Sequence, residues 1–541
     1  MLETVIVIVG VLLFIQVIWL ISSYDLKRRR KTYIHEKFGS LPREKEWNDA
    51  VSNYYEMTRC ENGIDDITWN DLSMNEVFQR INQCDTSAGE EILYWKLRRN
   101  DMSDEERRVF EECTDFYGRN EKAREKIEML LCDIGKSRSS YYIPSYLDSI
   151  EEYMLQYPWI YRVLQGVLAV SAAVMIMWQN DRAAYGFLGV CVVNIVLYAL
   201  LKMKNETALS MIGTAVSLLR NAKQIARQDE TGEWFPELRE ALSGLRGVLR
   251  GERILRAQRE GSDSGDALGM LSDYIMGATL WRLTTYNKVM KRLRGHIDEY
   301  LTVYRCIGLL DAAVSTASFR KALSGYCTPE FTGEKRLEAE ELFHPLLKNP
   351  VANDLELDRG CLITGSNASG KSTFIKAVVV NAILAQSLNT CAAKRLVMPH
   401  AEVLTSMAVT DDILAGESYF IREIRYLKRI LDGLNDGRMM ICAVDEILRG
   451  TNTGERLRAS KAILEYLRDK KCIALVATHD KELTELLGES YKNYHFSEEI
   501  GEDDVVFSYR LMDGPATSQN AVKLLEYAGF PREIIDAAQG R

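Results

Sequence analysis

The sequence predicts a multidomain protein: an α-helical N-terminal and central part with three transmembrane helices, followed by a C-terminal α/β domain with a phosphate-binding loop. Three observations predict this class. Apolar runs at residues 4–22, 159–178 and 185–201 have about the length that a bilayer crossing needs. Charged stretches with helical patterning surround these runs. From about residue 331, short apolar runs alternate with longer helical segments, which indicates a parallel sheet with crossover helices.

The composition is that of a folded protein with several domains. The chain has 541 residues, 47% of them hydrophobic, and a formal net charge of -9. This length suggests about three or four domains. The acidic balance argues against a chain-wide basic surface for nucleic acid, although it leaves room for local basic patches. The 11 cysteines contain no CxxC pair, so we interpret them as reduced thiols rather than disulfides or zinc ligands.

The first apolar run is interpreted as an uncleaved membrane anchor within residues 1–26. Only Gln16 is polar near its middle. A cleaved signal peptide is the alternative, but the start MLE has no Lys or Arg and no small-residue cleavage site is evident. The basic cluster LKRRRK at 26–31 follows the run. The positive-inside rule therefore predicts that this side lies in the cytoplasm and the N-terminus outside.

A second apolar region, residues 159–203, predicts a transmembrane helical hairpin. Its two runs, WIYRVLQGVLAVSAAVMIMW and YGFLGVCVVNIVLYALL, are separated by the short polar turn QNDRAA. Aromatic residues lie near both expected interfaces, and Lys202 and Lys204 follow the second run. A buried helical pair in a soluble core is the alternative. With three spans, the protein is expected in the cell membrane as a multi-pass protein whose C-terminal domain is cytoplasmic.

The regions on either side of the hairpin are expected to be helical. Residues 27–158 form a charged cytoplasmic helical region, and residues 204–330 form a helical region of lever or core type. In the second region, apolar residues recur at spacings of three and four, which predicts a narrow packing stripe on one helix. The stripe consists of Leu209, Ile212, Val216 and Leu219.

The last region, residues 331–541, contains a phosphate-binding motif. GSNASGKS fits GxxxxGK[ST] between an apolar strand and the helical run TFIKAVVVNAILAQ. Backbone N–H groups of such a loop surround phosphate oxygens at a helix N-terminus, whereas a structural Gly-rich turn is the alternative. We expect Lys371 to reach the β- and γ-phosphates of ATP, and Ser372 to bind Mg²⁺. The nucleotide-binding residues are then Gly365, Ser366, Asn367, Ala368, Ser369, Gly370, Lys371, Ser372 and Thr373.

Two acidic residues end the strand-like run MMICAVDE. Asp445 is placed to hold Mg²⁺ through water, and Glu446 to orient or deprotonate the attacking water. The next apolar run ends in VATHD, where His479 is a candidate contact for the γ-phosphate. Surface acids and a packed strand-end histidine are the structural alternatives. Together with the loop, these residues predict an ATP hydrolase that uses ATP and Mg²⁺.

The order and spacing of these segments resemble the ATPase domain of the MutS family of DNA mismatch-repair proteins. The matching segments are ITGSNASGKSTF, DDILAGESYFIREI, VDEILRGTNTGE, ATHDKELTEL and SQNAVKLLEYAGFPREIIDAA. The resemblance is strong over about 300–541, moderate over 64–110, and not evident elsewhere. It implies an ABC-like ATPase domain of MutS type that hydrolyses ATP and dimerises, with DNA as a candidate partner.

The resemblance also implies a role that spacing does not. In the family, a Gly-x-Ser segment reaches into the partner subunit's nucleotide site, and Gly416 and Ser418 match it. Ser418 is therefore expected to complete the catalytic site of the partner. The C-terminal helical segment is expected to pack against the partner ATPase domain, so the resemblance implies a homodimer.

Departures from the family leave several points open. Pro350 and Val351 lie where the family often places an adenine-stacking aromatic residue, so adenine recognition is not assigned. No counterpart of the family's mismatch-reading domain is expected. A stripe of arginines at helical spacing suits DNA or lipid phosphates, or is a solvated helix face. It consists of Arg246, Arg250, Arg253, Arg256 and Arg259.

Two other functions remain as alternatives. An ABC-type transporter ATPase shares the loop, the acidic pair and the histidine, but needs an LSGGQ-like segment between the loop and the acids. The two LSG matches, at 242–244 and 323–325, both precede the loop. A nucleotide-binding membrane scaffold without turnover is the third interpretation, and the intact Lys371, Asp445 and Glu446 argue against it.

Overall fold

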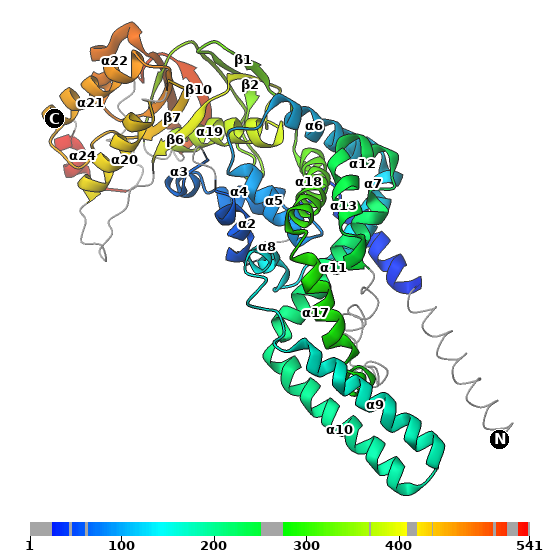
Figure 1. The fold of residues 1–541 in the computed structure, drawn as a ribbon. Helices are drawn as coiled ribbons and strands as arrows, with labels where there is room; N and C mark the ends of the chain where they lie inside the picture. Colours follow the sequence, from blue (N-terminus) through cyan, green and yellow to red (C-terminus); the bar gives the residue numbers. More distant parts are fainter. Residues whose placement is uncertain are drawn as a thin grey trace.

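The computed structural model describes residues 24–42, 46–59, 63–249, 274–366, 369–407, 419–434, 437–500, 505–516 and 529–538. Within these ranges the molecule is elongated (Figure 1), with an α/β part at one end, a helical body in the middle and a helical hairpin at the other end. The predicted combination of a helical N-terminal and central part with a C-terminal α/β part is confirmed. The predicted span at 4–22 lies outside the described residues.

The helical body is organised around one long helix, α18 (Ile297–Ala322), which packs against α5, α6 and α13. The other elements of the body are η1 (Asp49–Ser52), α2 (Asn53–Met57), α3 (Asp66–Asp71), α4 (Met74–Ile81), α5 (Ser87–Leu97), α6 (Asp104–Arg119), α7 (Glu121–Ile134), η2 (Ser140–Tyr142), α8 (Ile143–Asp148), α11 (Glu206–Ile225), α12 (Asp229–Trp234), α13 (Pro236–Gly244), α14 (Arg246–Leu249) and α17 (Trp281–Leu293). The predicted stripe on α11 is confirmed, because all four of its residues are buried.

The crossing of α18 with α5 is close because each helix contributes a glycine. A Cβ on Gly308 would lie 2.4 Å from Cγ1 of Ile92, and a Cβ on Gly89 would lie 2.2 Å from Oδ2 of Asp311. The space that the missing side chain of Gly89 leaves admits the buried Asp311 carboxylate. This carboxylate accepts hydrogen bonds from the backbone N–H of Asp85 at 3.0 Å and of Thr86 at 2.8 Å. Asp311 thereby fixes the start of α5.

The basic run that follows residue 26 forms ion pairs within the helical body. Residues 24–37 are helical, and Lys31 lies 2.7 Å from Glu125 of α7. Lys37 is nearly buried and contacts Asp85 at 2.8 Å and Glu128 at 3.1 Å. Burial lowers the pKa of Lys37, but these two carboxylates outweigh it and the net shift is upward. Membrane topology is therefore not the sole explanation of this basic run.

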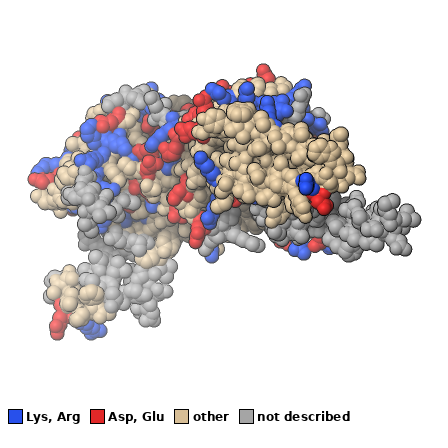
Figure 2. Space-filling model, turned by 60° about the horizontal axis from the view of Figure 1, so that its bottom comes forward, with Lys and Arg blue, Asp and Glu red and all other residues tan. Residues whose placement is uncertain are grey.

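Helices α9 (Pro158–Trp178) and α10 (Asp181–Lys204) form the predicted hairpin. By length and composition both can cross a membrane, with mean hydropathies of 1.8 and 2.1, and only 6% and 11% of their apolar windows are buried. They are therefore not a buried pair in a core. Figure 2 shows a broad area with few charged side chains at this end of the molecule. The predicted total of three spans is not supported, since the described residues contain two such helices.

The α/β part contains a six-stranded sheet with the order β10-β9-β4-β8-β7-β6. The strands from β9 to β6 run parallel, as predicted, whereas β10 pairs antiparallel with β9. The expectation of an all-parallel sheet is corrected here, because β9 and β10 are too close in sequence for a parallel crossover. The strands are β4 (Cys361–Thr364), β6 (Glu402–Ser406), β7 (Met440–Asp445), β8 (Cys472–Ala477), β9 (Lys492–Ile500) and β10 (Val505–Asp513).

A second, four-stranded sheet with the order β1-β5-β2-β3 was not predicted from the sequence. Its strands are β1 (Glu330–Thr332), β2 (Leu337–Leu342), β3 (Asn353–Leu357) and β5 (Arg395–Pro399). The helices of the α/β part are α19 (Lys371–Leu388), α20 (Tyr419–Gly433), α21 (Thr453–Arg468), α22 (Lys481–Leu487), η4 (Gly488–Ser490) and α24 (Arg532–Ala538).

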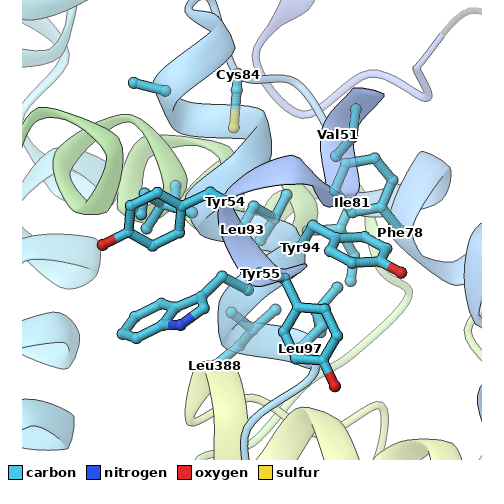
Figure 3. Packing of buried hydrophobic residues seen from close by; sticks show 14 of the residues in the cluster. Val51, Tyr54, Tyr55, Phe78, Ile81, Cys84, Leu93, Tyr94, Leu97 and Leu388 are labelled. Carbon is cyan, nitrogen blue, oxygen red and sulfur yellow. The ribbon is translucent and has the colours of Figure 1, made fainter. Parts of the chain in front are cut away.

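The core of the helical body is continuous with the α/β part. Figure 3 shows Leu388, from the end of α19, beside Tyr55 and Leu97 of the helical body. Arg320 of α18 reinforces this junction with hydrogen bonds to the backbone O of Asn389 and to Oγ1 of Thr390, both at 2.9 Å. The helix that begins at the predicted phosphate loop is thus fixed to the helical body at its other end.

The buried carboxylates beside Lys37 predict a pH dependence of stability. Burial raises the pKa of Glu128 from 4.5 to about 7. The folded protein therefore holds this proton more tightly than the unfolded chain does, and the free energy of unfolding falls as pH rises through this window. Glu128→Gln removes the titrating carboxylate, so the free energy of unfolding should no longer fall as pH rises. We expect the substitution to be more stabilising at pH 8 than at pH 5, by about 1 kcal/mol.

Thermal unfolding of the variant and the parent protein at both pH values measures this difference. Glu125→Gln is the matched control, because it removes a more exposed carboxylate from the same helix. An unchanged pH slope in Glu128→Gln would contradict the assignment.

Candidate nucleotide-binding site

A cavity of about 610 Å³ lies at the carboxyl ends of β4, β7 and β8, where the predicted motif residues meet. Parallel strands bring their carboxyl ends to one edge of a sheet, which is the usual position of ligand sites in such folds. The predicted residues that line the cavity are Gly370, Lys371, Ser372, Thr373, Asp445, Glu446 and His479. The structure therefore brings together motifs that are more than a hundred residues apart in the sequence.

The loop between β4 and α19 has the backbone that its glycines permit. Gly365 has φ 145° and Gly370 has φ 107°, and a Cβ at Gly365 would lie 2.7 Å from the backbone O of Phe496. The Nζ of Lys371 donates hydrogen bonds to the backbone O of Gly365 at 2.9 Å and of Ser366 at 2.7 Å. The ammonium group of Lys371 thus lies against the backbone at the start of the loop. Asn367 and Ala368 lie outside the described residues.

The loop also contains a buried hydroxyl that suits a phosphate. The Oγ of Ser369 has no hydrogen-bond partner among the described residues, although Ser369 is only 1% exposed. A buried polar atom without a partner is costly, and a phosphate oxygen would satisfy it. The residues of the loop therefore fit a nucleotide phosphate.

Two of the predicted catalytic residues, Glu446 and His479, form one line of contacts with Lys371 and Arg449. The Nε2 of His479 lies 3.0 Å from Oε1 of Glu446 and 3.5 Å from Nζ of Lys371. On the other side, Nε of Arg449 lies 2.9 Å from Oε2 of Glu446. The hydrogen bond from His479, with the charge of Arg449, holds the pKa of Glu446 below its ordinary value. Glu446 is therefore an ionised carboxylate at neutral pH.

The backbone at the acidic pair directs the two side chains differently. Asp445 is the last residue of β7 and pairs with Ala477 of β8. Glu446 has φ 63°, a conformation that non-glycine residues rarely adopt, and its N–H donates to the backbone O of Ala477 at 2.9 Å. Such strain persists where the surrounding structure fixes it and often marks a functional site.

A Mg²⁺ ion fits the donor atoms that Ser372 and Asp445 bring to this cavity. Mg²⁺ prefers hard oxygen ligands and is usually held by one or two protein groups, waters and substrate phosphates. No group of three His, Cys, Asp or Glu residues within the described ranges forms a metal site of its own.

The far side of the cavity is lined by residues that the sequence did not indicate. Tyr509, in the irregular part of β10, lines the cavity and is 46% exposed. Its φ is 51°, and Asn353 holds the bulge by donating to the backbone O of Tyr509 and accepting from the N–H of Leu511. Val351, which the sequence had already placed in the expected region of adenine recognition, also lines the cavity. The sequence does not reveal this bulge. Regular alternation of side chains along a strand was therefore not enough to predict that Tyr509 faces the loop.

His344 is a second residue of the cavity that sequence reasoning missed. It follows β2, and burial, with the nearby charge of Lys376, lowers its pKa to about 4. His344 is therefore neutral at physiological pH and does not add a positive charge to the site. Its Nδ1 accepts from the N–H of Leu346 at 3.3 Å, which gives it a positioning role in this turn.

The segment after the acidic pair is anchored to α20. Glu423 is 2% exposed and accepts a hydrogen bond from the N–H of Arg449 at 3.0 Å. Gly450 fits closely against Phe420, since a Cβ there would lie 3.1 Å from its ring. Asn452 caps α21 by accepting from the N–H of Glu455. Gly416 and Ser418, directly before α20, lie outside the described residues, so the role of Ser418 stays a prediction.

The arginine stripe is described only at its start. Arg246 is exposed in α14, whereas Arg250, Arg253, Arg256 and Arg259 lie outside the described residues. Its contact with phosphates therefore stays a prediction.

Comparison with known proteins supports the family resemblance. A family model described as MutS domain V matches residues 361–541. The DNA mismatch repair protein MutS of Clostridium kluyveri is 31% identical over 290 residues, which cover 50% of this chain and 33% of that protein. A MutS protein of Thermus thermophilus is 30% identical over 256 residues, or 46% of this chain and 30% of its own.

A third relative, the DNA mismatch repair protein MutS of Staphylococcus haemolyticus, is 30% identical over 291 residues, which cover 51% of this chain and 33% of the relative. The chain thus spans about a third of the length of the curated relatives it matches. The strand ends that carry the loop, the acidic pair and the histidine all lie within the part matched by MutS domain V. Residues 361–541 are thus similar to MutS domain V, and about half of the chain is similar to DNA mismatch repair proteins MutS.

Proposed function

We propose that this protein is a MutS-type ATPase that binds ATP with Mg²⁺ and hydrolyses it at the cavity between β4, β7 and β8. The observation that supports this best is the meeting of the phosphate loop, Asp445, Glu446 and His479 in one cavity of about 610 Å³. A cavity of this volume is in the usual range for small-molecule ligands.

The proposed roles follow from the geometry. Lys371 neutralises charge on the β- and γ-phosphates, and Ser372 with Asp445 supplies oxygen ligands to Mg²⁺. The ion would polarise the phosphoryl group and offset its developing charge. Glu446 accepts a proton from the attacking water or orients it, which its ionised state permits. His479, held between Lys371 and Glu446, is positioned to sense the γ-phosphate.

We propose further that the protein acts as a homodimer with composite sites. Ser418 would reach the partner's γ-phosphate, as the MutS resemblance implies. Next to it, α20 presents Ile421 and Ile424, which are 45% and 40% exposed. Exposed apolar side chains on the helix that directly follows Ser418 support a subunit contact there. A two-fold axis would then generate two identical sites.

DNA and the membrane are the proposed larger partners. The relatives are named as DNA mismatch repair proteins, which supports DNA as a partner of this chain. The exposed apolar hairpin α9–α10 supports insertion into a membrane, with both ends of the hairpin on one side. ATP binding and hydrolysis would move the helical body, and through it a DNA or protein partner near the membrane.

The two alternative functions are less well supported. A transporter-type ATPase is disfavoured because the similarity found is to MutS domain V. A scaffold that binds nucleotide without hydrolysing it would not need the contacts that run from Lys371 through His479 to Glu446. Measurements of ATP turnover distinguish this scaffold from an ATPase.

Nucleotide turnover is tested with two substitutions in the loop and at the acidic pair. Lys371→Ala should abolish ATP binding, because it removes the cation facing the phosphates. Glu446→Gln should keep binding and slow hydrolysis by ~10² or more, the usual scale for loss of a positioned base. ATP binding and phosphate release measured on the purified protein check both. Normal turnover in both variants would disprove the ATPase proposal, whereas absent turnover in the parent protein would favour the scaffold.

Adenine recognition is tested at Tyr509, which we propose stacks on the base. Tyr509→Ala should weaken ATP binding about tenfold, since stacking of one base on an aromatic ring contributes about 1–3 kcal/mol. Tyr509→Phe keeps the ring and should bind like the parent protein. Calorimetric titration with ATP and with inorganic triphosphate separates base from phosphate contacts. Equal weakening for both ligands would show that Tyr509 does not contact the base.

Membrane topology is tested by cysteine labelling in intact cells. Asp181 begins α10 at the tip of the hairpin, so Asp181→Cys should react with an impermeant maleimide added outside. Asp298 begins α18 in the helical body and is exposed, so Asp298→Cys should react only after cell lysis. Labelling of the parent protein gives the background from its native thiols. The reverse pattern would place the ATPase outside the cell, where ATP is scarce.

A further inference from the structure

We infer that residues 274–281, a helical turn and break that packs beside α9 and α10, form a further bilayer-contacting element with lipid as its partner. This element packs on the proposed membrane hairpin and leads directly into α17. The inference rests on the proposed membrane insertion of α9 and α10, and it assigns lipid contact to a segment too short to span a bilayer.

The chain breaks its helix at Leu280. Residues 274–279 are helical, Leu280 is left-handed with φ 52°, and α17 starts at Trp281. Around such a break, backbone carbonyls need partners other than the next helical turn. Here the partners are side chains of the two candidate spans. Nδ2 of Asn194 donates to the backbone O of Ala278 at 2.8 Å, and Nε2 of Gln165 donates to the backbone O of Thr279 at 2.9 Å.

These two donors are unusual residues for their helices. Asn194 is fully buried at 0% exposure, although the apolar window of α10 is only 11% buried. Polar residues inside apolar spans are costly, and they are found where they pair with other protein groups. Irregular backbone at membrane depth is likewise tolerated only where protein groups satisfy it. At membrane depth, the break needs the two amides to satisfy its carbonyl groups. The two amides, in turn, need the break as their hydrogen-bond partner.

The inner face of the segment packs closely on α10. A Cβ on Gly277 would lie 3.0 Å from Cδ1 of Tyr198 and 3.5 Å from Cγ1 of Ile195. Leu280 is fully buried, and the OH of Tyr198 accepts from Nη1 of Arg282 at 2.8 Å. The segment is thus packed firmly against α10.

The outer face is apolar and exposed. Tyr274, Ile275 and Trp281 are 56%, 53% and 55% exposed. Tyr and Trp are enriched at membrane–water interfaces, because one part of the ring system is apolar and the other can hydrogen-bond. No Asp, Glu, Lys or Arg occurs in YIMGATLW, the sequence of the segment. Continuity with the exposed hairpin makes lipid the partner that this face fits.

The position along the hairpin agrees with the inner boundary of a bilayer. Gln165 lies seven residues after the start of α9, and Asn194 lies ten residues before the end of α10. At about 1.5 Å per residue, the break is about 10–15 Å above the hairpin base. The charged Arg162, Lys202 and Lys204 lie closer to the base. The segment would therefore occupy the headgroup region and the adjoining acyl chains of the cytoplasmic leaflet.

Photo-crosslinking to lipid tests this placement. The full chain is prepared with a benzophenone amino acid in place of Trp281 and reconstituted into vesicles of phosphatidylcholine and phosphatidylglycerol. After illumination, mass spectrometry identifies lipid adducts on the labelled peptide. The matched control is Lys288, which is exposed on α17 seven residues further along and hence on the same face, about 10 Å away. Val170, 64% exposed on α9, reports insertion of the hairpin itself.

We expect lipid adducts at 281 and 170, with at least a tenfold lower yield at 288. Adducts at 170 but not at 281, or protein adducts in place of lipid at 281, would overturn the inference while leaving hairpin insertion intact. Absence of lipid adducts at 170 and 281 would overturn both proposals. If the 281 variant does not fold, the same label at Ile275 replaces it, with the same expected result and the same contradicting ones.

Discussion

The contact of Arg320 with the end of α19 is the interaction on which the rest of the structure depends. Arg320 is 4% exposed and joins α18 to the backbone of Asn389, while both of its Nη atoms pair with Glu111 of α6 at 2.8 and 2.6 Å. The other end of α19 is Lys371, in the phosphate loop. Helix α19 therefore links the phosphate loop to α18, which follows α17 in the chain, and α17 contacts α9 of the hairpin.

A second connection runs beside the first. The carboxylate of Asp71, in α3, accepts from Oγ1 of Thr405 at 2.6 Å and from the N–H of Met407 at 3.0 Å. Met407 directly precedes the segment that contains Ser418. Thus the helical body contacts the α/β part both at the end of α19 and at the end of β6. Two separate contacts fix an orientation, which a single junction would leave free to rotate.

Buried polar groups determine the specific packing at both ends of the molecule. In the helical body, Asp311 lies against Gly89 and fixes the start of α5. At the hairpin, Asn194 does the same for the break after Ala278. In both places an apolar side chain would add burial but would leave backbone groups without partners. The polar residue therefore specifies one arrangement of the helices.

The sequence by itself determined where the candidate site residues lie relative to three strand ends and which segments form the hairpin. The GxxxxGK[ST] loop, the acids after β7 and the histidine after β8 are local signals, because each depends on a strand end and its next few residues. Apolar length likewise predicted α9 and α10. Only the tertiary structure decided what depends on pairing between distant segments: the second sheet, antiparallel β10, Tyr509 and His344 in the cavity, and the amides of Gln165 and Asn194 at a break more than eighty residues away. Such contacts leave no periodic trace in the sequence, since either partner alone is an ordinary residue.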